Sequence, residues 1–162
     1  MTQIQQQQTA APTWQIAAIY LAGIIALIGV VIHVATVFAG PSWYVFFGAP
    51  AKVVESARNG TWLAPVGGFV IAGLMAICAA YAFSALGLIR RLPLLRTGLA
   101  GMAAICLIRA LILWPLMINH PALRNTFEIV AAIVWGLAGV GFVFGFRLAH
   151  RKSGLSATIA ES

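Results

Sequence analysis

The amino-acid sequence predicts an all-α integral membrane protein, a bundle of four transmembrane helices with a short interfacial helix in the first outer loop. Its composition is the first reason: 62% of the 162 residues are hydrophobic and 8% are charged, whereas about a quarter of a soluble domain is charged. The second reason is that four segments are long enough to cross a hydrocarbon core, which takes roughly 20 apolar residues. These spans are residues 13–38, 61–89, 97–118 and 126–146.

The positions of the basic residues are the third reason, and they predict the orientation of the chain. Most of the ten lie between spans two and three or after span four: Arg90, Arg91, Arg96, Arg147, Arg151 and Lys152. Cytoplasmic loops carry an excess of lysine and arginine, so we expect both termini and the short middle loop to be cytoplasmic in a cell inner membrane. Topology thereby explains the net charge of +7, and nucleic acid is not an expected partner.

The two ends of the chain are predicted to be cytoplasmic tails on either side of one transmembrane domain, residues 13–148. Residues 1–12 are rich in glutamine and are expected to be disordered. They lack a basic region, and the apolar stretch after them is longer than that of a cleavable signal, so we expect span one to be retained. Residues 149–162 are expected to form a flexible tail.

The first span and the loop that follows it bring polar and aromatic residues to the outer side. His33 lies near the outer end of span one, and Trp43 and Tyr44 are predicted to belong to an interfacial aromatic belt. Pro50 suits the first residue of a short surface helix, which Gly60 is expected to end.

Spans two and four carry small residues at the spacing that lets membrane helices approach closely. In span two every fourth residue is small, and in span four two glycines stand four positions apart: Ala64, Gly68, Ala72, Ala76, Ala80 and Ser84, then Gly141 and Gly145. Two of these sets are candidate contacts with a membrane-protein partner or a second copy of the chain: Gly68, Ala72, Ala76 and Ala80, or Gly141 and Gly145.

A single arginine, Arg109, lies just past the midpoint of span three and is the most informative residue of the sequence. An arginine at the centre of a span costs about 2.5–3.5 kcal/mol on insertion scales, so it should face the bundle and find a partner. Glu128, at the start of span four, is the only acid within any span. We therefore expect Arg109 and Glu128 to pair, with His33 in the same outer half of the membrane.

This pairing supports two interpretations. In the first, Arg109 and Glu128 form an internal staple that fixes helix register and binds nothing. In the second, intramembrane ionisable groups mark a functional site, here an outward-opening pocket for an amphipathic ligand such as a quinone, a lipid headgroup region or a small hydrophobic acid. The candidate ligand-binding residues are His33, Arg109, Glu128, Trp43, Tyr44, Trp62, Trp114 and Asn119.

Other chemistry has less support in the sequence. A haem would need facing axial ligands, for which only His33 and His120 could serve. The histidines are too scattered for a metal site, so no metal is expected. Cys78 and Cys106 lie inside apolar spans, where thiols are usually inert packing residues. No group of residues indicates a catalytic nucleophile.

Several short motifs follow one another along the chain: the turn Phe47-Gly48-Ala49-Pro50, the hairpin residues Arg91 and Pro93, the outer His120, and the stretch Asn125 to Glu128. Their order resembles that of the DoxX-like family of small four-helix membrane proteins, and the resemblance covers most of the chain in layout. It implies a four-helix bundle and a redox-linked membrane subunit, within a functionally diverse family.

Three hypotheses follow for the function. The protein is an accessory or redox-linked subunit that holds a hydrophobic ligand such as a quinone or lipid; or it is a small proton-coupled transporter of a hydrophobic acid; or it is a purely structural partner in a membrane complex. The first predicts ligand that purifies with the protein. The second predicts pH-dependent binding that Glu128→Gln abolishes, and the third predicts that losing both Arg109 and Glu128 leaves function intact.

Overall fold

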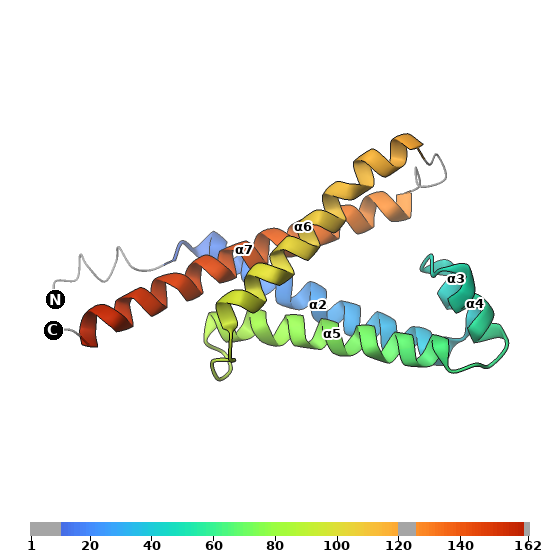
Figure 1. Cartoon of the computed structure of the whole chain (residues 1–162), viewed down its shortest axis with the longest axis horizontal. Helices are drawn as coiled ribbons and strands as arrows, with labels where there is room; N and C mark the ends of the chain where they lie inside the picture. The colour runs from blue at the N-terminus through green and yellow to red at the C-terminus, as the bar shows by residue number, and fades with distance from the viewer. Residues whose placement is uncertain (1–10, 120–125, 161–162) are drawn as a thin grey trace. The chain divides into compact units, whose positions relative to one another are not determined.

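The computed structural model describes residues 11–119 and 126–160, and in these ranges the chain is all-α. Four long apolar helices dominate it (Figure 1): α2 (Thr13–Ala39), α5 (Leu63–Leu86), α6 (Leu95–Asn119) and α7 (Thr126–Ala160). Each is long and apolar enough to cross a membrane. The predicted class, a multi-pass membrane protein with four membrane-spanning helices, is confirmed. Residues 1–10, which hold most of the predicted N-terminal tail, lie outside the described residues.

The helix bounds agree with the predicted spans except at the end of α7. That helix continues to Ala160, although the expected tail begins at residue 149. Hydropathy falls at Arg147 because charged residues begin there, yet no proline follows, and alanine, leucine, arginine and lysine are good helix formers. The loss of hydropathy therefore does not end the helix.

Two short helices, α3 (Pro41–Phe46) and α4 (Ala51–Arg58), connect α2 to α5. The helix expected after Pro50 is α4, and it ends before Gly60 as predicted. The structure adds α3, which lies where only an aromatic belt was expected. Gly40 makes this extra helix possible, because its φ of 91° turns the chain sharply at the end of α2 and Pro41 then starts α3.

The chain divides into two compact units, which share α2 and α5. Unit 1 comprises Met1–Ile25 and Ala80–Ser162, and unit 2 comprises Ala26–Ala79. Unit 1 thus holds α6, α7 and the adjoining ends of α2 and α5. Unit 2 holds α3, α4 and the remaining parts of α2 and α5.

In unit 1, glycines on α7 bring three helices together. A Cβ atom on Gly141 would lie 2.6 Å from the Cβ of Ala22 and would overlap the carbonyl of Ala18, both on α2. A Cβ on Gly139 would lie 2.8 Å from the Leu107 side chain of α6. In Figure 1, α6 and α7 lie side by side. These close approaches are the small-residue packing that membrane helices use in place of a hydrophobic driving force.

In unit 2, α5 packs against α2 through the first part of its small-residue series. Ala64, Gly68 and Ala72 are buried, whereas Ala76 is exposed and Ala79 is buried. Residues four apart advance by about 40° more than one turn of an α-helix, so a strict four-residue series winds around the helix. The contact with α2 instead follows the helical period of 3.6.

Four of the six residues in the predicted docking sets are covered within the chain. Gly68 and Ala72 are buried in unit 2, and Gly141 and Gly145 are buried in unit 1. A Cβ on Gly145 would lie 3.3 Å from Leu99. Ala76 is exposed and Ala80 is half-buried, so a contact of this part of α5 with a partner stays a prediction.

Candidate functional site

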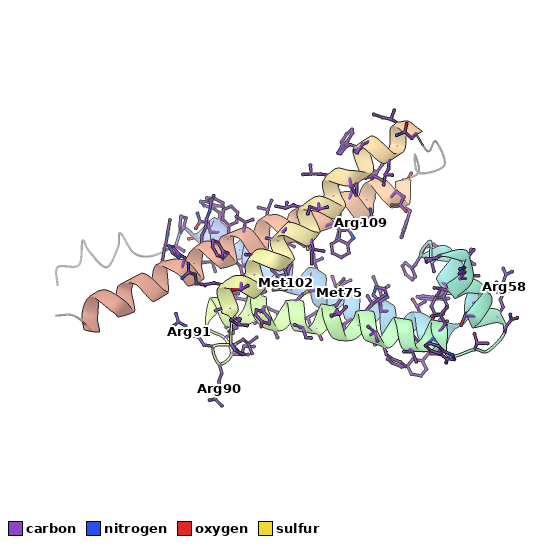
Figure 2. The ribbon with its side chains drawn as sticks, in the orientation of Figure 1. Arg58, Met75, Arg90, Arg91, Met102 and Arg109 are labelled. Carbon is purple, nitrogen blue, oxygen red and sulfur yellow. The ribbon has the colours of Figure 1, made fainter. Side chains whose placement is uncertain are left out.

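The predicted pair of Arg109 and Glu128 is present in unit 1. The Nη2 of Arg109, on α6, donates a hydrogen bond to Oε2 of Glu128, on α7, over 3.4 Å. The two helices are in contact nearby, since a Cβ on Gly136 of α7 would lie 3.7 Å from the Cβ of Ala110 on α6. Side-chain exposure is 42% for Arg109 and 19% for Glu128, so the carboxylate is the better covered partner. Figure 2 shows Arg109 on the part of α6 that lies beside α7.

The other candidate ligand residues are distributed over both units. Trp114 and Asn119 lie towards the end of α6 in unit 1, and both are exposed. His33, Trp43, Tyr44 and Trp62 belong to unit 2. A single pocket lined by all of these residues stays a prediction.

A pocket of about 190 Å³ lies in unit 2, where α3 and α4 meet the ends of α2 and α5. We call it the Tyr44 pocket. Of the predicted candidates, Tyr44 lines it, and Trp43 and Trp62 are not among the lining residues. Its walls come from every element of the unit: Val37, Gly40, Tyr44, Ala57, Gly60, Thr61, Ala64 and Pro65.

The hydroxyl of Tyr44 is a buried donor without a hydrogen-bond partner in the described part of the chain. Only 7% of the residue is exposed. The oxygen lies 3.6 Å from the position that a Cβ of Gly68 would take, so it is at contact distance from α5 at residue 68. Burial also raises the pKa of the Tyr44 phenol, which keeps the hydroxyl protonated. Tyr44 therefore presents a hydrogen-bond donor with nothing to receive it.

A polar network holds the other side of the pocket. The Oγ of Ser56, on α4, lies 2.6 Å from Oγ1 of Thr61 and accepts a hydrogen bond from the backbone N–H of Ala64 over 3.0 Å. The Ser56 side chain thereby satisfies one of the spare donors at the start of α5. It also engages the Thr61 hydroxyl, which leaves Tyr44 as the donor that still lacks a partner.

The chemistry of the Tyr44 pocket follows from its walls. No lining residue carries a formal charge, and burying an unneutralised charge in such a place is very costly. The walls are mostly apolar, and one of the residues that form them, Tyr44, carries a buried hydroxyl without a hydrogen-bond partner among the described residues. The pocket therefore suits an uncharged molecule with an apolar body and a hydrogen-bond acceptor.

Sequence reasoning found Tyr44 but missed most of this site. Val37, Ala57 and Ala64 carry no chemical signal in a sequence, because small apolar residues occur throughout the chain. Ser56 was overlooked on the surface helix, where Lys52 and Glu55 mark the solvent-facing side. The two turn glycines, Gly40 and Gly60, were the available signal.

The metal site, the haem alternative and the family resemblance concern residues outside this pocket. Among the described residues, no group of three or more metal-ligating side chains occurs. His120, which the haem alternative requires, and Asn125, which contributes to the family resemblance, lie outside the described residues.

No protein-family model, curated protein or solved structure matches this chain. The resemblance to the DoxX-like family therefore stays a prediction.

Proposed function

We propose that this multi-pass membrane protein binds an uncharged hydrophobic ligand, a quinone or a lipid-like molecule, in the Tyr44 pocket and acts as an accessory or redox-linked subunit. The observation that supports the proposal is the buried hydroxyl of Tyr44, which lacks a partner among the described residues and belongs to a residue that lines a mostly apolar pocket. Buried polar groups in native proteins are almost always hydrogen-bonded, so an exception calls for a missing partner. A hydrogen-bond acceptor on the bound ligand would be that partner.

The size of the pocket favours one ring or one short polar segment of a larger molecule. A cavity of about 150 Å³ lined by apolar side chains holds benzene, and the Tyr44 pocket measures about 190 Å³. A quinone ring fits this volume and carries carbonyl oxygens that accept hydrogen bonds. An ester carbonyl of a lipid has the same acceptor chemistry, and in both cases an apolar tail would extend into the bilayer.

The orientation of the pocket follows from the charge distribution. The basic connection between α5 and α6 and the basic end of α7 are proposed to be cytoplasmic by the positive-inside rule, with the protein in the cell inner membrane. The loop that carries α3 and α4 is then on the outer side, and the ligand would enter from the outer leaflet.

The remaining candidates have separate proposed roles. Arg109 and Glu128 neutralise each other and hold α6 against α7, in accord with their hydrogen bond. His33, Trp43 and Trp62 share unit 2 with the pocket, and we propose that they border the path of the ligand tail.

Filling the pocket is expected to remove the ligand. Ala57 is half-buried and lines the Tyr44 pocket, so Ala57→Phe would place a ring where the ligand binds. Protein purified in mild detergent, extracted with organic solvent and examined by mass spectrometry should yield a quinone or neutral lipid in near-equimolar amount from the wild type, and little from Ala57→Phe.

Ala76→Phe is the matched control, because Ala76 lies in the same unit on an exposed face of α5 and not in the pocket. It should retain the ligand. Equal ligand in both variants, or a wild-type protein that carries none, would contradict the proposal. A change in the absorbance of the extract on reduction identifies a quinone, whereas a redox-inactive extract indicates a lipid.

A further inference from the structure

A second and larger pocket, of about 580 Å³, lies in unit 1 between the α5–α6 connection and the last part of α7. It shares no lining residue with the Tyr44 pocket, and the inference below does not depend on the ligand proposed for that pocket. Three of the residues that line it are polar: Arg91, Arg96 and Thr97. Several others are large and apolar, among them Leu92, Leu94 and Phe146. We call it the Arg91 pocket.

The Arg91 pocket carries positive charge that the described chain does not neutralise. The whole sequence has three acids, and none of them lines the pocket. Glu128 is bonded to Arg109, Glu55 belongs to unit 2, and Glu161 lies outside the described residues. Two guanidinium groups in one pocket without a carboxylate suit an anion.

The α5–α6 connection is held in a fixed shape around these arginines. The hydroxyl of Tyr81 donates to the carbonyl of Pro93 over 3.0 Å. The Oγ of Ser84 donates to the carbonyl of Arg90 and accepts from the N–H of Leu92, each over 3.1 Å. Three side-chain hydrogen bonds from the end of α5 thus fix the backbone on both sides of Arg91. The pocket is formed before any ligand binds, which reduces the entropy cost of binding.

Leu94 and Phe146 give the pocket an apolar side. Leu94 has a φ of 53°, the left-handed region that branched side chains avoid, and 77% of it is exposed. Leu94 lies in the turn before α6, where its carbonyl accepts a hydrogen bond from the N–H of Gly98 over 2.8 Å, and this turn leaves its apolar side chain exposed at the pocket. On the opposite side the guanidinium carbon of Arg96 lies 5.9 Å from the centre of the Phe146 ring, a cation–π arrangement that orients it.

We propose that the Arg91 pocket binds the phosphate headgroup of an anionic phospholipid. Arg91 and Arg96 would hold the phosphate oxygens, because arginine matches them with two parallel N–H donors. Leu94 and Phe146 would lie against the glycerol backbone and the first methylene groups. The apolar side, together with a volume well above that of a free phosphate, favours a lipid over a soluble anion. Basic pockets between transmembrane helices on the cytoplasmic side, where the positive-inside rule would put this connection, bind anionic lipid headgroups.

Native mass spectrometry of the full-length protein with added phosphatidylglycerol or phosphatidylcholine tests the proposal. The wild type should bind one phosphatidylglycerol more tightly than phosphatidylcholine. Arg91→Gln combined with Arg96→Gln should weaken phosphatidylglycerol binding about 30-fold, at about fivefold per arginine near a membrane surface. Inorganic phosphate at millimolar concentration should not displace the lipid.

The control removes the same charge from the same end of the protein. Arg90→Gln combined with Arg151→Gln alters arginines that do not line the pocket; Figure 2 shows Arg90 and Arg91 extending in different directions from the connection. Phosphatidylglycerol binding should weaken about threefold at most in this double variant, because charges outside the pocket are screened by salt. Equal losses in both pairs would mean diffuse electrostatics, and displacement by phosphate would mean a small-anion site; either result overturns the proposal.

A single substitution covers the case in which the double variant does not fold. Arg91 is exposed, so Arg91→Gln should fold normally and still weaken phosphatidylglycerol binding about fivefold. Arg90→Gln, one residue away, should leave it unchanged. Identical binding by these two variants would also overturn the proposal.

Discussion

Replacing Gly141 by alanine is expected to lower the free energy of unfolding by about 2–3 kcal/mol, the range of an overpacked core. The new Cβ would overlap the backbone carbonyl of Ala18 and lie 2.6 Å from the Cβ of Ala22. Neither atom can move by rotating a side chain, so α7 and α2 must separate, and the contacts on both sides of residue 141 weaken. Unfolding by sodium dodecyl sulfate in mixed micelles, followed by circular dichroism, measures the change.

Gly101→Ala is the matched control in another long helix. A Cβ at Gly101 would meet nothing within 4 Å, and alanine in place of glycine stabilises a helix interior by about 0.5–1 kcal/mol. We therefore expect the two substitutions to have opposite signs. A Gly141→Ala protein as stable as the wild type would show that α2 and α7 do not approach at this residue.

Replacing Glu128 by leucine is expected to cost about 2 kcal/mol, because it leaves the guanidinium of Arg109 without its counter-charge. Removing one partner from a fully buried pair costs about 3–5 kcal/mol. The lower figure applies here because 42% of the Arg109 side chain is exposed and the hydrogen bond is long, at 3.4 Å. Folded yield and the same micelle unfolding assay report the loss.

The double variant Arg109→Leu with Glu128→Leu completes a double-mutant cycle. Because it removes both charges, it should be more stable than Glu128→Leu alone. If it also retains the ligand of the Tyr44 pocket, the pair acts as a staple between α6 and α7. If the double variant loses as much stability as Arg109→Leu and Glu128→Leu lose together, then Arg109 and Glu128 are not coupled.

The sequence was sufficient for the helices and for the ion pair because both follow from the cost of placing polar groups in lipid. Apolar stretches of the required length gave α2, α5 and α6 to within three residues. An arginine inside a span demands a counter-charge, and Glu128 was the only acid that could supply one. Such predictions depend on the membrane as a solvent and not on the details of side-chain packing.

The Tyr44 pocket depends on packing, and for that reason the sequence did not define it. Tyr44 was assigned to an interfacial belt on the basis of residue type, whereas the structure buries its hydroxyl beside Gly68. That position is set by the turn at Gly40, the extra helix α3 and the contact of α5 with Val37. Each is a consequence of how elements meet, which residue spacing within one element does not encode.

The small-residue series in α5 was likewise only partly interpretable from the sequence. The spacing correctly indicated close helix packing, but it did not say whether the contact was within the chain or with another molecule. The structure shows Gly68 and Ala72 buried within unit 2 and Ala76 exposed. A period of four, continued over several turns, cannot stay on one face of a helix whose period is 3.6.

The stability of Tyr44→Phe with and without ligand shows whether the Tyr44 hydroxyl binds a ligand or already has a partner in the protein. In delipidated protein the substitution should raise the free energy of unfolding by about 1–2 kcal/mol, because it removes a buried donor that has no partner. Adding back the extracted ligand should stabilise the wild type more than Tyr44→Phe, since only the wild type can donate to the ligand acceptor. If Tyr44→Phe is instead less stable than the wild type without ligand, the hydroxyl already has a protein partner. If the ligand stabilises both proteins equally, the Tyr44 pocket is not the binding site.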